Sequence, residues 1–266
     1  MLYELFTSLT TPCPQYVRHI DYLYEIIAMK SRHGRNRAAW EPHLENTRRF
    51  VLSSAEKCRN RNKVVVLGSG LLLDVPLREL SSMFREVVLL DIVLLPDVIK
   101  SARRYDNVRI LQHDVTNIVR KLHENILQGR NELPESSPSI PEINDDTGLV
   151  VSLNILSQLL VMPRAYALKK LRDLDEDRLD DWCGNIVRLH CAFLASLSCS
   201  VCLIADHEFI QRDRQGTIVS RGSTISGFTL PKPDASWSWN IVPPGEDHRF
   251  LSKELNVGAW WTTNGS

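Results

Sequence analysis

Short apolar runs alternate with longer mixed segments along most of the chain. The runs are rich in Val, Leu and Ile and have no polar face, which is typical of parallel strands buried on both sides. They lie at 63–67, 87–90, 108–111, 149–153 and 200–205. The segments between them are long enough for crossover helices, and three such helices are expected at 75–84, 96–104 and 182–196. This alternation predicts an α/β fold that is doubly wound around a mainly parallel sheet.

The N-terminal part of the chain has a different pattern. Residues 14–59 carry apolar and aromatic side chains at helical spacings, with interruptions expected at Gly34 and Pro42. We therefore expect residues 1–60 to form an N-terminal helical cap segment. Residues 61–266 are expected to form the α/β domain.

The composition is that of an ordinary globular protein, with 266 residues of which 43% are hydrophobic and 24% are charged. Basic and acidic residues number 32 each, so no net field attracts nucleic acid or an acidic membrane. No apolar run approaches the roughly 20 residues that span a bilayer, and the N-terminus lacks the pattern of a secretion signal. These features predict a cytoplasmic protein and leave its oligomeric state open.

Six cysteines are scattered through the chain, which favours reduced thiols over a disulfide framework. Two of them, Cys199 and Cys202, form a CxxC sequence within an apolar run. In a strand their thiols point to opposite faces, because the side-chain period is two. The adjacent side chains of Asp206, His207 and Glu208 rarely converge on one ion. We therefore expect core thiols and no metal site.

A glycine turn, Gly68-Ser69-Gly70, ends the first apolar run. Its glycines allow a tight turn and a close approach of the backbone to a ligand. Ligands of doubly wound sheets bind outside the carboxyl ends of the strands. Asp91 ends the second strand about 20 residues later and has the two oxygens needed to accept from both ribose hydroxyls. Asp114 follows the third strand and is a candidate acceptor for an adenine amino group, while a turn or capping role stays open for both carboxylates.

Four segments resemble the class I S-adenosylmethionine-dependent methyltransferases. They are VVVLGSG at 64–70, LLDIV at 89–93, ILQHDVTN at 110–117 and TGLVVSLNILSQL at 147–159. The resemblance covers residues 61–266 and implies S-adenosyl-L-methionine as the cofactor. It implies that the glycines lie against the methionine moiety, Asp91 holds the ribose and His113-Asp114 border the adenine. The expected cofactor-binding residues are Gly68, Ser69, Gly70, Asp74, Asp91, Ile92, His113, Asp114, Val115 and Asn154.

The end of the chain fits the same family. Arg214-Gln215-Gly216 suits the turn of a hairpin. The runs at 236–244 and 255–261 predict two closing strands. They match the antiparallel final strand of these methyltransferases, so we expect a seven-stranded sheet.

Val66 and Leu73 bear on the choice between this family and other functions. The family carries an acid where this chain has Val66, and Asp74 is the candidate to contact the amino group of the cofactor instead. A nicotinamide-dependent Rossmann oxidoreductase also fits the glycine turn and Asp91, but its third glycine is replaced by Leu73. A non-catalytic methyltransferase-like binding protein is the third alternative, because of Val66.

Methyl transfer requires an aligned acceptor and, for some acceptors, the removal of a proton. The resemblance places Asn154 and Ser157-Gln158 toward the transferable methyl group. The segment 152–158 lacks the Asn/Asp-Pro-Pro-aromatic and Pro-Cys motifs of enzymes that methylate bases. A small molecule or a protein side chain is therefore the expected acceptor. Candidate catalytic residues are Asn154, Tyr166 and His207, with Gln158 and Glu208 also on the acceptor side.

His207 is expected just past the carboxyl end of a strand, where an imidazole can accept a proton near neutral pH. A polar and aromatic cluster in the cap segment either covers the pocket, binds an acidic acceptor or packs on the domain. Its members are Arg32, His33, Arg35, Asn36, Trp40 and His43.

Overall fold

Five parallel strands form the centre of the sheet in the computed structural model, which describes residues 7, 10–246 and 251–263. These strands are β1 (Lys63–Leu67), β2 (Glu86–Asp91), β3 (Val108–Gln112), β4 (Thr147–Leu153) and β5 (Ser200–Arg212). The later strands are β6 (Ile218–Ser223), β7 (Ala235–Val242) and β8 (Ser252–Thr263).

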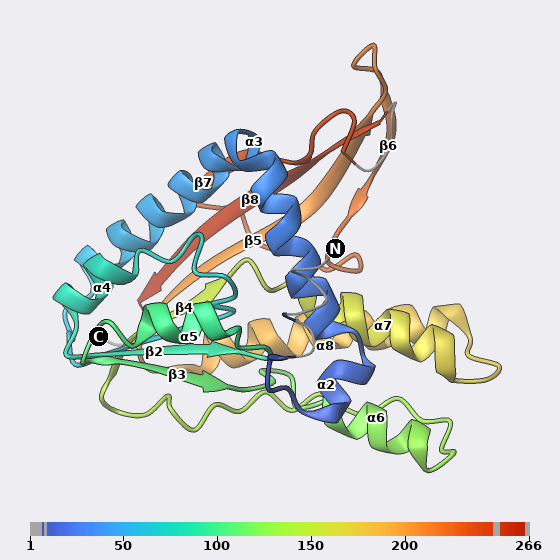
Figure 1. The fold of residues 1–266 in the computed structure, drawn as a ribbon, viewed down its shortest axis with the longest axis horizontal. Helices are drawn as coiled ribbons and strands as arrows, with labels where there is room; N and C mark the ends of the chain where they lie inside the picture. Colours follow the sequence, from blue (N-terminus) through green and yellow to red (C-terminus); the bar gives the residue numbers. More distant parts are fainter. Residues whose placement is uncertain (1–6, 8–9, 247–250, 264–266) are drawn as a thin grey trace.

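The strands follow the order β3-β2-β1-β4-β5-β8-β7, with β6 paired to β5 outside this path. Strand β8 is antiparallel to both β5 and β7. The predicted doubly wound, mainly parallel seven-stranded sheet with an antiparallel closing strand is thus confirmed (Figure 1). Strand β6, the second arm of the predicted hairpin, adds an eighth strand.

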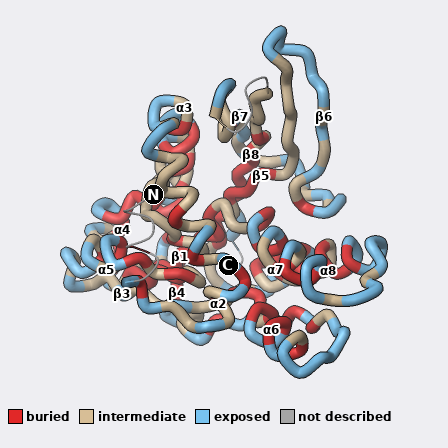
Figure 2. Tube along the Cα trace, turned by 45° about the vertical axis from the view of Figure 1, so that its right-hand side comes forward, coloured by how far each residue is buried: buried red, intermediate tan, exposed pale blue. Residues whose placement is uncertain are grey.

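Helices cover both faces of the sheet because the central strands are apolar on both sides. Val65 and Leu67 of β1 belong to a core shared with α6 (Val119–Leu127), α7 (Gln158–Lys170) and α8 (Glu176–Ser196). Val64 and Val66 point the other way, into a core shared with α3 (Tyr22–Lys57) and α4 (Leu77–Met83). Two short helices, α2 (Gln15–His19) and α5 (Pro96–Ala102), complete the described set. Figure 2 shows the buried residues gathered around the sheet and the largely exposed hairpin of β6.

Three crossover helices lie where the pattern predicts them, as α4, α5 and α8. Helix α8 begins at Glu176, ahead of the apolar segment, and the carboxylate of Asp175 accepts the backbone N–H of Asp177 at 3.3 Å and caps it. Helices α6 and α7 were not predicted. The sequence of α7 has almost no apolar stripe and contains Pro163, so its pattern gives little helical signal.

Helix α3 spans both expected breaks as two helical stretches joined by a kink close to Gly34. Pro42 lies inside the helix, and the backbone leaves helical geometry only at Asn36 (φ −114°, ψ 23°). The side chain of Asn36 donates to the carbonyl of Arg32 at 3.0 Å, a local bond of the kind that bends helices. The bend lets α3 extend from the α2 side of the sheet to β7 (Figure 1).

Strand β5 is longer than its apolar run because it has partners on both edges. Its first half pairs with β4 as far as Ile204, and its second half pairs with β6 from Glu208 onward. Strand β8 pairs along the other edge from Ser200 to Arg212, with an irregularity between Asp206 and Glu208. The expectation that His207 follows the end of a strand is therefore wrong, since His207 lies at a bulge inside β5.

The CxxC thiols lie on opposite sides of the sheet, as predicted. Cys199 packs against the α6–α8 core, whereas Cys202 is buried in the α3–α4 core. Burial raises the pKa of Cys202 to about 12, so this thiol stays protonated. All six cysteines are free. Within the described ranges, no helix combines the length and the apolarity needed to cross a bilayer.

Replacing Trp40 tests the contact between α3 and β7. Trp40 is buried, and its indole N–H donates to the carbonyl of Ile241 at 3.0 Å. Trp40→Phe loses this bond and leaves a small void, so we expect a loss of roughly 1–3 kcal/mol of unfolding free energy. Urea denaturation measures it, with Tyr24→Phe on the same helix as the control because Tyr24 is 72% exposed. An equal, small effect of both changes would contradict the packing described here.

Candidate functional site

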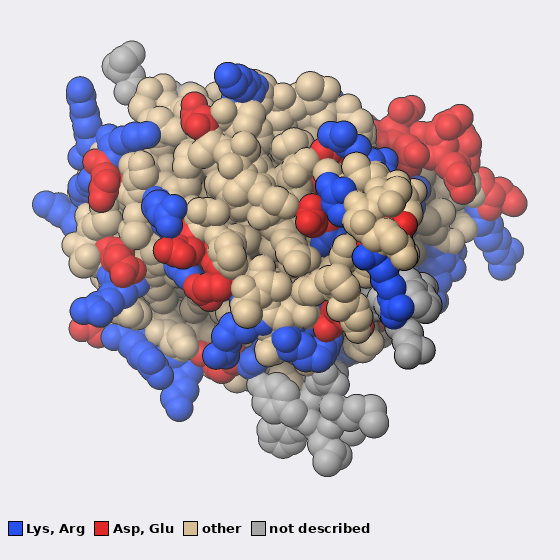
Figure 3. Space-filling view, turned by 90° about the horizontal axis from the view of Figure 1, so that it is seen from above, with Lys and Arg blue, Asp and Glu red and all other residues tan. Residues whose placement is uncertain are grey.

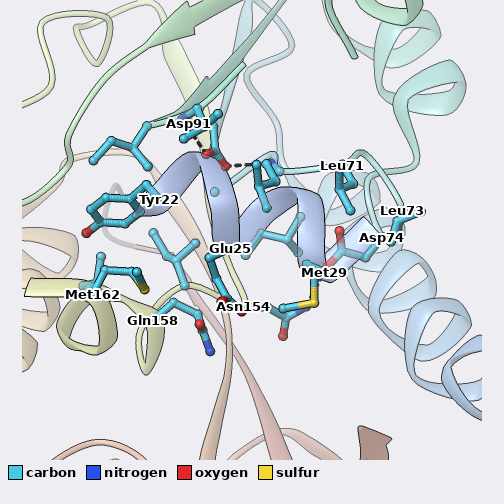
Figure 4. A pocket seen from close by; sticks show the side chains of 18 of the residues that line it. Tyr22, Glu25, Met29, Leu71, Leu73, Asp74, Asp91, Asn154, Gln158 and Met162 are labelled. Atoms are coloured by element: carbon cyan, nitrogen blue, oxygen red, sulfur yellow. Dashed lines mark hydrogen bonds between the residues drawn. The ribbon is translucent and has the colours of Figure 1, made fainter. Parts of the chain in front are cut away.

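A pocket of about 260 Å³ lies at the carboxyl ends of β1, β2 and β4 and beneath the first turns of α3 (Figure 4). Nine of the residues predicted to bind the cofactor line it: Gly68, Gly70, Asp74, Asp91, Ile92, His113, Asp114, Val115 and Asn154. The tenth, Ser69, does not belong to the lining and is 1% exposed. The fold therefore brings most of the predicted residues to one place.

The glycine turn is held by the end of β2. The backbone N–H groups of Gly68 and Ser69 donate to the carbonyl of Leu90 at 2.9 and 3.1 Å. The carboxylate of Asp91 accepts from the N–H of Gly70 at 2.7 Å and from that of Val93 at 3.1 Å. Burial raises the pKa of Asp91. The turn role that stayed open for Asp91 in the sequence is therefore present, and Asp91 also lines the pocket.

The two glycines of the turn are needed for different reasons. Gly68 has φ +82°, and a Cβ there would overlap Cγ2 of Ile155 and lie 3.0 Å from the carbonyl oxygen of Leu153. Gly70 has φ +46°, but the nearest atom to its Cβ would be 3.9 Å away, on Asp91. Gly68 is therefore required by packing within the protein, and Gly70 by its backbone conformation.

Asp114 is used by the loop that follows β3. Its Oδ1 accepts from the N–H of Thr116 at 2.9 Å and its hydroxyl at 2.5 Å, and its Oδ2 accepts from the N–H of Val119 at 2.9 Å. These contacts tie the loop to the start of α6. The neighbouring His113 bonds to the carbonyl of Ser139 through Nε2 at 2.9 Å. The capping role left open for Asp114 is present, and its contact with an adenine stays a prediction.

A polar pair, Asp74 and Asn154, lies on the floor of the pocket next to His43. The amide nitrogen of Asn154 donates to Oδ2 of Asp74 at 2.7 Å and lies 3.4 Å from Nε2 of His43. The amide oxygen of Asn154 is buried and has no partner among the described residues. Burial raises the pKa of Asp74 to about 6, although the bond from Asn154 opposes this shift.

The protonation state of His43 follows from its neighbours. The indole N–H of Trp237 donates to Nδ1 of His43 at 3.0 Å, so in the neutral ring the proton is on Nε2. Burial lowers the pKa of His43 to about 3, which keeps the ring neutral. The imidazole stacks on Trp239 with ring centroids 4.0 Å apart. His43 is thus a fixed N–H donor in an aromatic wall and has no free nitrogen to act as a base.

The other two candidate catalytic residues lie outside the pocket. Tyr166 is buried elsewhere, where its hydroxyl bonds to Nδ1 of His123 at 2.9 Å. His207 lies at the bulge of β5, with its ring 6.5 Å from that of Trp260. Glu208 is bound by Arg221 and Asn256. Gln158 does line the pocket. The geometry therefore leaves Asn154 and Gln158 as the predicted acceptor-side residues that line the pocket.

The sequence did not reveal the residues that α3 and β7 contribute. Tyr22, Glu25 and Met29 lie one helical turn apart and point into the pocket (Figure 4). Burial, with the negative charges of Asp114 and Asp91, raises the pKa of Tyr22 well above 10, so its phenol is neutral. Trp239 and Ile241 enter from β7. Trp40 and His43 also line the pocket, so part of the cluster noted in the cap segment covers it.

The charge of the pocket has one sign. Glu25, Asp74, Asp91 and Asp114 line it, while its described lining includes no Lys or Arg. Carboxylates in a half-buried cavity without a basic partner are costly unless a ligand compensates them. The cavity is therefore suited to a ligand with positive charge.

Gly68→Ala and Gly216→Ala separate backbone conformation from packing. Both glycines have φ +82°, but a Cβ at Gly216 would meet nothing within 4 Å. Each change costs about 1–2 kcal/mol for the left-handed backbone, and only Gly68→Ala adds about 1–3 kcal/mol because Ile155, which is stiff, must move. Urea denaturation of both variants measures the difference. Equal losses would show that the space beside Gly68 is not needed.

Comparisons with known proteins found no matching protein-family model and no curated protein of similar sequence. Similar solved structures include a DhpI complex with SAH, 14% identical with a TM-score of 0.35, covering 87% of this chain and 93% of that one. A SAM-dependent methyltransferase from Aquifex aeolicus is 10% identical with a TM-score of 0.38 over 87% and 97% of the chains.

A third similar structure is the 1,6-didemethyltoxoflavin-N1-methyltransferase of Burkholderia thailandensis. It is 12% identical with a TM-score of 0.40, covering 92% of this chain and 87% of that one. Structural similarity at these TM-scores carries no argument about this chain. Its fold is established by the order and direction of its own strands. The parallel strands β1 to β5, with antiparallel β8 between β5 and β7, have the Rossmann-like methyltransferase fold that the sequence resemblance implies.

Proposed function

We propose that this protein is an S-adenosyl-L-methionine-dependent methyltransferase acting on a small molecule or a protein side chain. The charge of the pocket is the observation that carries the proposal. S-adenosylmethionine has a sulfonium and an ammonium group, and the pocket offers four carboxylates without Lys or Arg in its described lining. The position at the carboxyl edge of a doubly wound sheet agrees with a nucleoside ligand.

The same charge argues against a nicotinamide dinucleotide. Its pyrophosphate is negative, and Rossmann dehydrogenases bind it at the N-terminus of the helix that follows the glycine turn. Here α4 begins only at Leu77, and the turn is followed by Leu72 in a left-handed conformation (φ +59°). The glycine turn therefore offers no helix N-terminus to a phosphate.

Several residues fit parts of the cofactor. The carboxylate of Asp74, held by the amide nitrogen of Asn154, is an acceptor for its ammonium group. This arrangement gives Asp74 the role that an acid at Val66 has in the family. Asp91 is available to the ribose hydroxyls and Asp114 lies toward the adenine. When bound, the cofactor supplies an activated methyl group, so the protein needs to align the acceptor and exclude water.

The surface agrees with an acceptor other than nucleic acid. On the face shown in Figure 3, basic and acidic side chains are interspersed over most of the area. A surface that binds a phosphate backbone carries a stripe of positive charge.

Calorimetry with S-adenosylmethionine, S-adenosylhomocysteine and NAD tests the proposal. We expect binding of both sulfur nucleosides and none of NAD. Failure of both nucleosides to bind would refute the proposal, and tight NAD binding would favour the oxidoreductase. Binding without turnover on any acceptor, together with a stable protein partner, would favour the non-catalytic alternative.

Asp91→Ala is expected to weaken S-adenosylhomocysteine binding roughly 10- to 100-fold, because a charged acceptor of two hydroxyl hydrogen bonds is lost. The control is Asp106→Ala, an exposed carboxylate outside the pocket lining. Calorimetry gives the affinity, and thermal denaturation verifies that the variant is folded. Equal affinities of the two variants would exclude Asp91 from the cofactor site.

The affinity for S-adenosylhomocysteine should depend on the ionisation of Asp74. Only the carboxylate attracts the ammonium group, and the pKa of Asp74 is raised to about 6. We expect an affinity that is constant above pH 7 and that falls below pH 6, approaching roughly tenfold per pH unit. Asp74→Asn should remove most of this dependence and bind weakly at every pH. A parallel decline in both proteins would assign the titration to another group.

A further inference from the structure

We propose that the methyl acceptor is a primary amine carried on a flat apolar body, bound between Glu25, Asn154, Gln158 and the aromatic wall formed by Trp40, His43 and Trp239. This inference rests on the proposed methyltransferase function. The hydrogen-bonding groups, the charge and the shape of the acceptor end of the pocket narrow the class of acceptor.

The polar groups at this end have oxygen atoms available as hydrogen-bond acceptors. In Figure 4 the side chain of Glu25, from α3, points toward the space between Gln158 and Asn154. No ion pair or hydrogen bond of the Glu25 carboxylate occurs among the described residues. The amide oxygen of Asn154 is buried and unpartnered. A carboxylate and an amide oxygen that both lack donors suit a ligand that brings N–H groups.

The orientation of Gln158 is set by a chain of bonds behind it. The hydroxyl of Ser157 donates to Oδ1 of buried Asp206 at 2.7 Å, so its oxygen is free to accept the amide N–H of Gln158 at 3.3 Å. This bond holds the nitrogen of Gln158 toward Ser157 and leaves the amide oxygen for a ligand. Asn154 is oriented in the same sense, because its nitrogen is held by Asp74 at 2.7 Å. Both amides are thus held with their oxygens available as acceptors.

The wall beyond these groups is apolar and aromatic. Trp40 meets Trp239 edge to face, with centroids 5.2 Å apart, and His43 stacks on the same Trp239. Leu44 and Ile241 continue the wall. Such surfaces suit a flat apolar body and also attract a cationic amine. The buried indole N–H of Trp239 has no partner in the described part of the chain, so an ether or ring heteroatom on the body suits it.

Charge excludes the main competitors of an amine. Four carboxylates line the pocket, with no Lys or Arg in the described lining. A carboxylate or phosphate acceptor would be repelled at close range. An alcohol has a single O–H for several acceptor oxygens. A primary amine has enough N–H groups to satisfy Glu25 and one amide while its lone pair faces the methyl group.

Methylation of a neutral amine then balances with the groups present. The nitrogen lone pair forms the new N–C bond, and the C–S bond of the sulfonium breaks with its electron pair left on sulfur. An amine that binds as the ammonium ion first gives one proton to the carboxylate of Glu25, which passes it to water, and the methylated product leaves as an ammonium ion.

Three probes with one body test the proposal by binding rather than turnover. They are 2-(4-methoxyphenyl)ethylamine, 2-(4-methoxyphenyl)ethanol and 3-(4-methoxyphenyl)propionate, titrated calorimetrically into the full chain saturated with S-adenosylhomocysteine. We expect the amine to bind roughly tenfold or more tightly than the alcohol, as a charge-assisted bond implies, and the carboxylate to bind most weakly. Glu25→Gln should bring the amine to within about threefold of the alcohol, because the charge-assisted bond is lost.

The control variant is Glu56→Gln, an exposed residue of the same helix outside the pocket lining, which should retain the full preference. The proposal is overturned if the amine binds no better than the alcohol or the carboxylate, or if Glu25→Gln keeps the preference. It is also overturned if the amine fails to bind while S-adenosylhomocysteine binds. Failure of S-adenosylhomocysteine itself to bind would instead refute the proposed function.

Discussion

The bond between the Asp91 carboxylate and the backbone of Gly70 is the contact on which the site depends. At 2.7 Å it ties the turn after β1 to the end of β2, and the neighbouring carbonyl of Leu90 holds the first two residues of the same turn. With the turn fixed, Gly68 sits against Ile155 and so sets the position of the segment after β4. Asn154 belongs to that segment and has its own left-handed conformation (φ +52°). One carboxylate therefore orders three strand ends around a single cavity.

The two ends of the chain close that cavity together. Helix α3 from the N-terminal part and β7 from the C-terminal part meet through the bond from Trp40 to Ile241 and through the bond from Trp237 to His43. Neither element can form its share of the pocket alone, because Trp40 and Trp239 pack on each other. The helical cap segment proposed for residues 1–60 thus contacts the last strands as well as the parallel core.

The positions of the five parallel strands and of most crossover helices could be predicted, because buried parallel strands appear in the sequence as continuous apolar runs. The strand-end rule and the family resemblance together gave the ten cofactor candidates, nine of which line one pocket. Glu25 and Trp239 could not be found this way. The position of Glu25 depends on the bend of α3 at Asn36, and the position of Trp239 depends on the register of β7. Neither the bend nor the register produces a periodic pattern in the sequence. Tyr166 was misplaced because α6, which is remote in sequence, helps to bury it. His207 was misplaced because pairing with β6 extends the strand that contains it.

The absence of basic residues from the described lining links stability to ligand binding. The pKa of Asp74 rises from its ordinary value of 3.8 to about 6 in the folded protein, so between these values the folded state binds more protons than the unfolded state. Stability contributed by this group is therefore present at low pH and is lost as pH rises through about 6. At neutral pH the buried, ionised carboxylate lowers the free energy of unfolding. A cation that binds in the pocket of the folded state alone offsets this loss of stability. The charge of Arg48, which lies outside the lining, offsets this loss only in part. A basic residue within the lining would remove the attraction for a sulfonium, an ammonium or an amine.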